Sequence, residues 1–329
     1  MNNDLIEKVK TEFLDDTYII PQDETIYRIN QYGDRYYFKL DKDGKPIAKA
    51  STTTIINKYS PMSPFLLKWW CDWGYENAKA VMKESSMYGT FVHILWAKLL
   101  LRFNIDLSEI GIKEYLNKYF ESENEVFNYD FKEWHKKVKQ DLIGFVQWVQ
   151  DYQVRPIAIE MSIIGEKFSG TIDLVCNLGL PWYNPETGMT EIDYINAIVD
   201  WKSGRNDFYD DYIIQLAGYR QLWNEKFPDK SIFRIFNYGC KDFRLPIGKT
   251  VTPYRFKDQS DSELTGRWSH YVEMFNNEHP TLTIESKTEI KEDVINIESK
   301  VSDLIHTVNP LEFLEAEDAG NNTGQQETE

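Results

Sequence analysis

The stretch IVDWKSGRNDFYDDYIIQLAGYRQLW, residues 198–223, passes from an apolar run to a helical pattern within a few positions. Its first part predicts a buried β-strand that ends in two charged residues, Asp200 and Lys202. Side chains at positions i and i+2 of a strand lie on one face, so this carboxylate and this ammonium emerge side by side. Two explanations are open at this point: an ion pair at the end of a strand, or one part of an active site.

The second part of the stretch predicts a helix over residues 210–226, directly after this strand. Gln215 and Tyr219 are four residues apart and therefore share one face of the helix. We expect this face to lie over the end of the strand, where Gln215 can form a hydrogen bond. Two roles are open for Tyr219, which are contact with a nucleic-acid backbone and ordinary packing in the core.

Two apolar runs earlier in the chain, RPIAIEMSIIGE and FSGTIDLVCNL, predict strands joined by a tight turn. They place Glu160 and Asp173 in apolar surroundings, and burying a carboxylate is costly unless a partner or a metal ion compensates its charge. Gly170, three residues before Asp173, leaves room for another segment to approach the backbone closely. Glu160 has a second option, an ion pair with Lys167 across the hairpin.

A hydrolytic metal site explains this set of residues. Asp173 and Asp200 together offer the oxygen ligands that a hard cation such as Mg²⁺ prefers. A bound cation polarises a phosphoryl oxygen and lowers the pKa of a bound water. Lys202 then orients or helps to activate the water, or it offsets charge that develops on the phosphate. The sequence thus favours a centre that cleaves phosphodiester bonds.

In chain order, GTID, DWK and QLAGY resemble the GxxD, (D/E)xK and QxxxY motifs of the PD-(D/E)XK nuclease superfamily, and its RecB-like branch is the most similar. Two further segments agree with that branch. STTTIINKYSPMSPFLLKWW, residues 51–70, is similar to its S-x-T-T-x-I segment, and YGTFVHILW, residues 88–96, is similar to its G-T-x-x-H helix. The resemblance covers about residues 50–220, and the layout resembles stand-alone members such as phage exonucleases and the mitochondrial genome maintenance exonuclease.

The resemblance implies a metal site formed by His93, Asp173, Asp200 and the backbone carbonyl of Trp201. The ion would be Mg²⁺ or Mn²⁺. The alternative for His93 is a hydrogen-bonded histidine in the core, because the helix predicted around it is almost wholly apolar.

The resemblance also implies catalytic roles, which fall on Glu160, Asp173, Asp200, Lys202, Gln215 and Tyr219. Tyr219 and Arg205 are the candidates for contact with DNA, although Arg205 can equally face solvent. The 27 residues from Asp173 to Asp200 are more than this motif usually has. The turn-rich residues 181–193 account for the excess, and they predict a projecting loop or hairpin.

We expect an α/β (α+β) fold with a central mixed sheet flanked by helices, restriction-endonuclease-like in its core. The predicted parts are a β-meander at residues 1–50, a helical arm at 51–154, the nuclease core at 155–280, and an acidic, largely disordered tail at 281–329.

Two helices are expected early in the arm. Ser63 is the predicted N-cap of the first, with a proline at its first position, and this helix should run to about Glu84. The second should begin at about Gly89. Trp69, Trp70 and Trp96 are expected in the core rather than as stacking platforms for bases.

The composition narrows the possible classes of protein. The net charge is −16, and residues 281–329 contribute 12 acidic and 3 basic side chains to it, but net charge does not describe the local potential of a cleft. The three cysteines lie far apart without a CxxC pair, which argues against an iron–sulfur cluster and a disulfide framework. No apolar run is long enough to cross a membrane and no targeting signal is evident, so we expect a cytoplasmic protein.

These features together predict a Mg²⁺- or Mn²⁺-dependent deoxyribonuclease, an exonuclease on single-stranded or end-containing DNA in replication, recombination or repair. An endonuclease of the same fold, of resolvase or restriction type, is one alternative. A non-catalytic nucleic-acid-binding accessory protein is the other. No GxxxxGK[ST] motif is present, which excludes a helicase–nuclease. The acidic tail either binds a protein partner or only increases solubility.

Overall fold

The computed structural model of the chain describes residues 19–31, 33–103, 105–122, 129–204, 207–241, 253–280, 282 and 289–291. Two predictions fall outside these ranges. One is the contact of Arg205 with DNA, and the other is the character of nearly all of the tail after residue 281.

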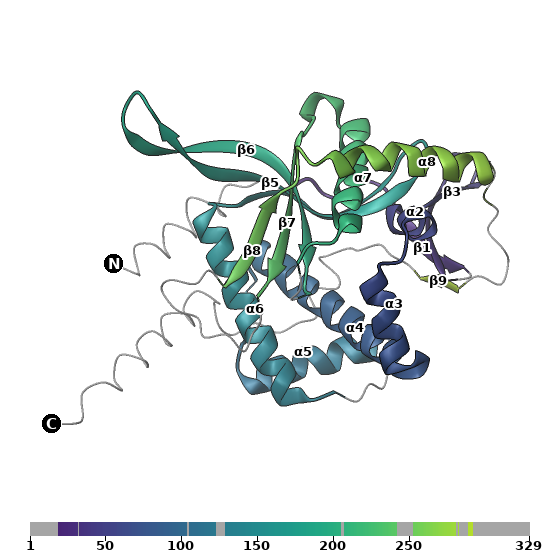
Figure 1. Ribbon diagram of the computed structural model, residues 1–329, viewed down its shortest axis with the longest axis horizontal. Helices are drawn as coiled ribbons and strands as arrows, with labels where there is room; N and C mark the ends of the chain where they lie inside the picture. Colours follow the sequence, from purple (N-terminus) through teal and green to yellow (C-terminus); the bar gives the residue numbers. More distant parts are fainter. Residues whose placement is uncertain are drawn as a thin grey trace.

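A five-stranded mixed sheet forms the centre of the fold (Figure 1). Its strands run in the order β4-β5-β6-β7-β8, and only the pair β6 and β7 is parallel. The helix that follows β6 makes the crossover that a parallel pair requires. The strands are β4 Arg155–Ile164, β5 Ser169–Asn184, β6 Met189–Lys202, β7 Arg234–Cys240 and β8 Tyr254–Asp258. The predicted α+β fold with a central mixed sheet is therefore confirmed.

Helices cover both faces of this sheet, because its strands alternate their apolar side chains between two core clusters. In β5, Leu174 and Cys176 pack on the side of α4, α5 and α6, whereas Val175 packs on the side of α2, α7 and α8. The helices are α2 Thr52–Tyr59, α4 Tyr75–Leu100, α5 Glu109–Ser122, α6 Phe131–Asp151, α7 Asp210–Lys226 and α8 Arg267–Glu278, with the short 3-10 helices η2 Pro228–Lys230 and η3 Glu263–Gly266.

A smaller antiparallel sheet lies beside the central one, with the strand order β3-β2-β1-β9. Its strands are β1 Tyr27–Gln31, β2 Asp34–Leu40, β3 Pro46–Ala50 and β9 Glu289–Lys291. Ser169 at the start of β5 anchors this sheet, since its hydroxyl donates to the carbonyl oxygens of Lys49 and Ala50, each at 3.0 Å. The N-terminal meander is thus attached to the strand that carries Asp173.

The first two long helices of the arm have other boundaries than predicted. Ser63 caps α3 (Pro64–Trp73) as expected, because its hydroxyl accepts a hydrogen bond from the amide of Leu66. This helix ends at Gly74, whose φ of 73° favours glycine, and α4 then runs without a break through residues 85–88. A second prediction is wrong, because α3 buries none of its residues and Trp69 and Trp70 are only partly covered.

Residues 181–193 form the outer part of a long β5–β6 hairpin, which projects at the upper left of Figure 1. The two strands pair without interruption from Leu174 with Val199 to Asn184 with Met189. The extra length between Asp173 and Asp200 is therefore paired strand rather than irregular loop. Among the helices in the described ranges, none combines the length and the apolar character needed to cross a bilayer.

The lack of space around Gly170 leads to a testable prediction about the fold. A Cβ atom at this position would lie 2.9 Å from Thr52 Oγ1 on α2 and 3.1 Å from Tyr219 Cε1 on α7, and both neighbours are buried. We expect Gly170→Ala to lower the free energy of unfolding by about 1–3 kcal/mol, because both helices must shift. Chemical denaturation measures this change. Gly266→Ala is the control, since nothing lies within 4 Å of its added Cβ, and equal stability of both variants would contradict the prediction.

Candidate active site

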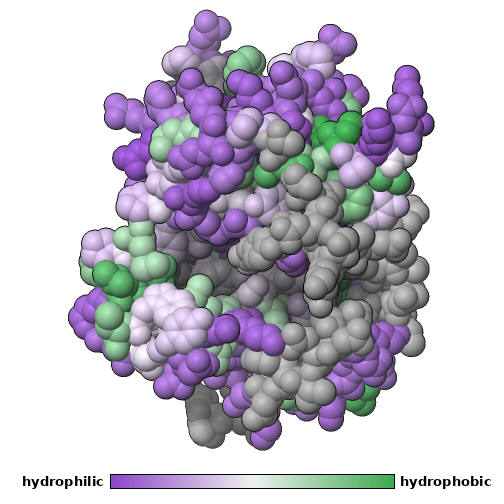
Figure 2. Space-filling model, turned by 90° about the vertical axis from the view of Figure 1, so that its right-hand side faces the viewer, coloured by the Kyte–Doolittle hydropathy of each residue, from purple (hydrophilic) through white to green (hydrophobic). Residues whose placement is uncertain are grey.

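A cleft of about 650 Å³ opens where the central sheet, α4, α7 and the N-terminal sheet meet. Its lining contains all seven candidate residues whose side chains the sequence proposed for metal binding or catalysis, namely His93, Glu160, Asp173, Asp200, Lys202, Gln215 and Tyr219. Figure 2 shows a hollow near the middle of one face of the molecule, between a strongly hydrophilic upper part and a lower part with apolar side chains. Residues more than 120 positions apart in the sequence thus share one cavity.

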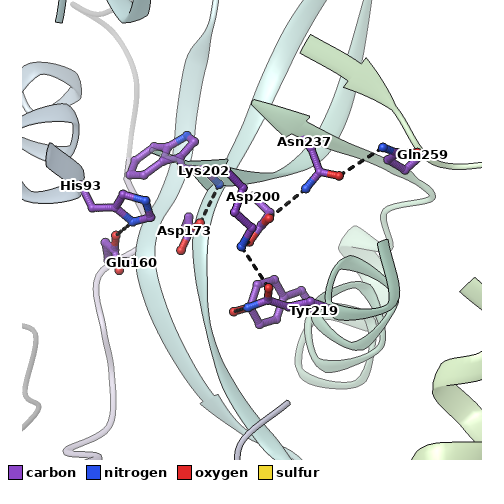
Figure 3. Close-up of polar contacts among 10 residues, drawn as sticks. His93, Glu160, Asp173, Asp200, Lys202, Tyr219, Asn237 and Gln259 are labelled. Atoms are coloured by element: carbon purple, nitrogen blue, oxygen red, sulfur yellow. Dashed lines mark hydrogen bonds and ion pairs between the residues drawn. The ribbon is translucent and has the colours of Figure 1, made fainter. Parts of the chain in front are cut away.

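The register of the central sheet brings three carboxylates together. Asp173 and Asp200 lie one position beyond the Leu174–Val199 pair, each on its own strand. Glu160 lies on β4 opposite Asp173, between the pairs Ile159–Leu174 and Met161–Ile172. The acidic residues therefore come from three adjacent strands at one level of the sheet (Figure 3).

Glu160 lies next to His93, and no ion pair joins it to Lys167 among the contacts of the described residues. The Nδ1 atom of His93 lies 3.5 Å from Oε1 of Glu160. The backbone φ of Glu160 is +48°, a left-handed conformation inside a strand that is strained for a residue with a Cβ. Such strain is most often kept where a side chain must be aimed at a functional site.

Lys202 and Asp200 form an ion pair, and this pair is part of the cleft. The ammonium donates to Oδ1 of Asp200 at 2.8 Å and to Oε1 of Gln215 at 3.0 Å. The amide nitrogen of Gln215 in turn donates to the hydroxyl of Tyr219 at 2.5 Å. The two explanations considered for the Asp200–Lys202 pair are therefore compatible, and α7 holds Lys202 from one side as expected.

Two residues that the sequence did not suggest support Asp200 from the other side. The side-chain amide of Asn237, which pairs with Asp200 in the parallel β6–β7 ladder, donates to Oδ2 at 2.8 Å. Gln259 then donates to Oδ1 of Asn237 at 3.2 Å, and both amides are buried (Figure 3). The only signal in the sequence was a single polar residue inside the apolar run RIFNYGC.

Trp201 separates Asp200 from Lys202 and faces the opposite side of β6. Its ring packs against those of Trp96 and Phe145, and its backbone N–H donates to Oδ2 of Asp173 at 2.7 Å. The core thereby fixes the strand that carries both charges. The carbonyl of Trp201 as a metal ligand stays a prediction.

The pKa values of two buried acids, Asp173 and Asp200, are raised, and so are those of two bases, His93 and Lys202. Burial raises the pKa of Asp200 to about 7, to which the carboxylate of Asp173 adds and which Lys202 opposes. Burial likewise raises the pKa of Asp173, against the effect of His93. For Lys202, burial acts to lower the pKa, but the carboxylates of Asp200 and Asp173 outweigh it and the pKa is raised.

The pKa of His93 is also set by a balance between burial and nearby carboxylates. Burial acts to lower its pKa, but the hydrogen bond to Glu160 and the charge of Asp173 outweigh that effect, so the pKa is raised. Three carboxylates thus lie close together in a poorly solvated part of the cleft, and a divalent cation would stabilise their ionised forms.

The donor atoms of the site fit such a cation. Among the described residues, one group offers three metal-ligating atoms within 4.8 Å of one another, and it consists of His93, Glu160 and Asp173. Carboxylates suit Mg²⁺ and Mn²⁺, whereas imidazole suits later transition metals, so the mixed set fits Mn²⁺ at least as well as Mg²⁺. Asp200 lies beside this group with both of its oxygens already hydrogen-bonded.

No protein-family model matches the chain, and no curated protein matches it.

The buried carboxylates predict a pH-dependent effect of metal on stability. Because the pKa of Asp200 is raised from 3.8 to about 7, the folded apo protein loses stability from this group as pH rises through that window. A divalent cation binds the ionised form, so Mn²⁺ should raise the Tm more at pH 8 than at pH 6. At a concentration 100 times its Kd, the added stability is about 2.7 kcal/mol.

Thermal unfolding with and without Mn²⁺ measures this effect. Glu160→Gln should lose most of the Mn²⁺-induced rise, because it removes one of the three clustered ligands. Glu166→Gln, an exposed glutamate in the following turn, should keep the rise. An equal response of the two variants would show that the ion binds elsewhere.

Proposed function

We propose that the chain is a metal-dependent nuclease that hydrolyses phosphodiester bonds in the cleft. The observation that carries this proposal is the convergence of Glu160, Asp173 and Asp200 with Lys202 at one level of the central sheet. At this point of the cleft, three acids beside one lysine would repel a phosphate unless a cation is bound between them. This arrangement also agrees with the resemblance to the PD-(D/E)XK superfamily.

The bound ion would supply Lewis-acid polarisation of the phosphoryl oxygen and a more acidic water. His93, Glu160 and Asp173 would hold it, with Asp200 beside them. Lys202 keeps its proton because its pKa is raised. Its ammonium therefore acts as a positive charge that stabilises the developing phosphorane oxygens and positions the attacking water, rather than as a general base.

Gln215 and Tyr219 position this lysine. Gln215 accepts one hydrogen bond from the ammonium, and the phenol of Tyr219 is held as a neutral hydroxyl because burial raises its pKa well above the ordinary value. The side chain of Tyr212 adds a ring whose centroid lies 4.4 Å from Nζ of Lys202. These contacts leave the lysine few alternative orientations.

Substrate size follows from the cleft. The cleft has a volume of about 650 Å³, which is in the range of small-ligand pockets, and we propose that it receives one strand or a strand end at a time. We therefore propose an exonuclease on single-stranded or end-containing DNA. Such an enzyme would act in replication, recombination or repair.

Cleavage of end-labelled single-stranded, duplex and circular DNA with Mg²⁺ or Mn²⁺ tests the proposal. Lys202→Ala should reduce the rate at least about 100-fold, because a preorganised charge next to the reacting phosphate is lost. Lys167→Ala removes an exposed lysine from the β4–β5 turn and should leave the rate unchanged. Wild-type rates in Lys202→Ala would refute the mechanism, and cleavage of circles would indicate an endonuclease. Absence of cleavage in the wild type, with binding retained, would indicate an accessory protein.

A further inference from the structure

The N-terminal sheet contributes a basic wall to the cleft, opposite in charge to the carboxylates. Arg28, Arg35 and Tyr37 all line the cavity. The register of the sheet explains this, because Tyr37 pairs with Arg28 and Asn30 pairs with Arg35. Paired residues and residues two apart share a face of a sheet, so these three side chains lie on the same face.

The backbone of Arg35 is held by hydrogen bonds to the start of α2. Its backbone N–H donates to the hydroxyl of Thr54 at 2.8 Å, and the same hydroxyl donates to its carbonyl oxygen at 2.8 Å. The backbone N–H of Ser51 also donates to that carbonyl at 2.9 Å. Both Ser51 and Thr54 are buried, so the start of α2 holds Arg35 at the edge of the cavity.

The wall is also tied to the strand that carries the catalytic candidates. Thr171 Oγ1 donates to the hydroxyl of Tyr37 at 3.1 Å, two residues before Asp173. Thr52, the first residue of α2, donates to the carbonyl of Ser169 at 3.0 Å on the same strand. The position of the arginines relative to the carboxylates is therefore set by direct contacts between the two sheets.

The guanidinium of Arg35 is suited to an anion from outside the chain. Arg35 is exposed, and within the described ranges no acidic side chain forms an ion pair with it. Among the described residues, the other acidic and basic side chains that line the cavity include Arg28, Lys202, Glu160, Asp173 and Asp200. Among the described residues that line the cavity, Arg35 is an exposed cation without an ion pair, so it is available to a phosphate that enters next to the acidic cluster.

We propose that Arg35, on the face that it shares with Arg28, binds a backbone phosphate of the nucleic-acid strand adjacent to the phosphate that reacts. The planar fork of arginine matches phosphate oxygens in a two-pronged hydrogen bond. The first turn of α2 borders the same part of the cavity, and its positive end adds to the attraction. This inference rests on the proposed nuclease function and names the part of the chain that holds the substrate.

Binding of a fluorescent single-stranded oligodeoxynucleotide to the full chain with Mg²⁺ tests the proposal. The measurement uses the Asp200→Asn background so that the strand is not consumed. Arg35→Gln should raise the Kd about tenfold. It should also make the slope of log K against log salt shallower by about 0.7, because one phosphate contact is lost. Arg35→Lys should keep the slope.

Arg267→Gln is the matched control, because Arg267 lies half-exposed on α8 and outside the lining of the cleft. It removes the same charge and should leave both Kd and slope unchanged. Equal behaviour of Arg35→Gln and Arg267→Gln would overturn the proposal, as would absence of any strand binding. Displacement of the strand from the wild type by inorganic phosphate alone would assign the site to free phosphate and overturn the strand assignment.

Kinetics separate this proposal from the nuclease function. In the otherwise wild-type chain, Arg35→Gln should raise KM and leave kcat unchanged, because Arg35 contacts a phosphate that does not react. If the wild type cleaves DNA and Arg35→Gln does not change KM, the proposed role of Arg35 is refuted and the proposed nuclease function is retained. If strand binding depends on Arg35 but the wild type does not cleave DNA, the nuclease function is refuted and the role of Arg35 in binding is retained.

Discussion

The carboxylate of Asp200 is 1% exposed, and much of the surrounding structure compensates the cost of that burial. Each of its oxygens accepts a hydrogen bond, one from Lys202 on its own strand and one from Asn237 on the neighbouring strand. Gln215 on α7 and Gln259 after β8 hold those two partners in turn. A single buried charge thereby connects the last strands of the central sheet with the helix that crosses over it.

The opposite side of the sheet supplies rigidity rather than charge. Trp201 lies between the two charged residues of its strand and packs among Trp96, Phe145 and Tyr238 in the core formed with α4 and α6. Because interiors are close-packed, this aromatic cluster fixes the strand on which both charges depend. The same core positions α4, which carries His93 to the acidic cluster. Successive residues of β6 therefore alternate, with Trp201 in the aromatic core on one face and Asp200 and Lys202 in the cleft on the other.

Much of this arrangement could be predicted from local patterns. The strand ends and the helix of residues 210–226 follow from periodicity, and the observed bounds of α7 agree with the expected ones. The proposed metal-binding and catalytic side chains lie in one cleft, as charged residues inside and at the end of apolar runs suggested.

Other features depend on contacts that no local pattern records. Asn237 gave only a weak signal, since its importance comes from the register between two strands separated by a helix. Arg35 is part of a different sheet, and only the docking of that sheet brings it to the cavity. The helix break at Gly74 and the exposure of α3 were also missed, because apolar composition alone does not show whether a helix finds a partner.

The long β5–β6 hairpin has a consequence for how such a chain can vary. Asp173 and Asp200 lie at its base, just beyond the first pair of a ladder that continues for eleven pairs. Their separation in space is set by that first pair and not by the number of residues between them. Residues added or removed in equal numbers on the two strands would lengthen or shorten the projection and leave the acidic cluster in place. The number of residues between Asp173 and Asp200 can therefore change without moving the two carboxylates, and the tip of the hairpin is a place where a label can be inserted.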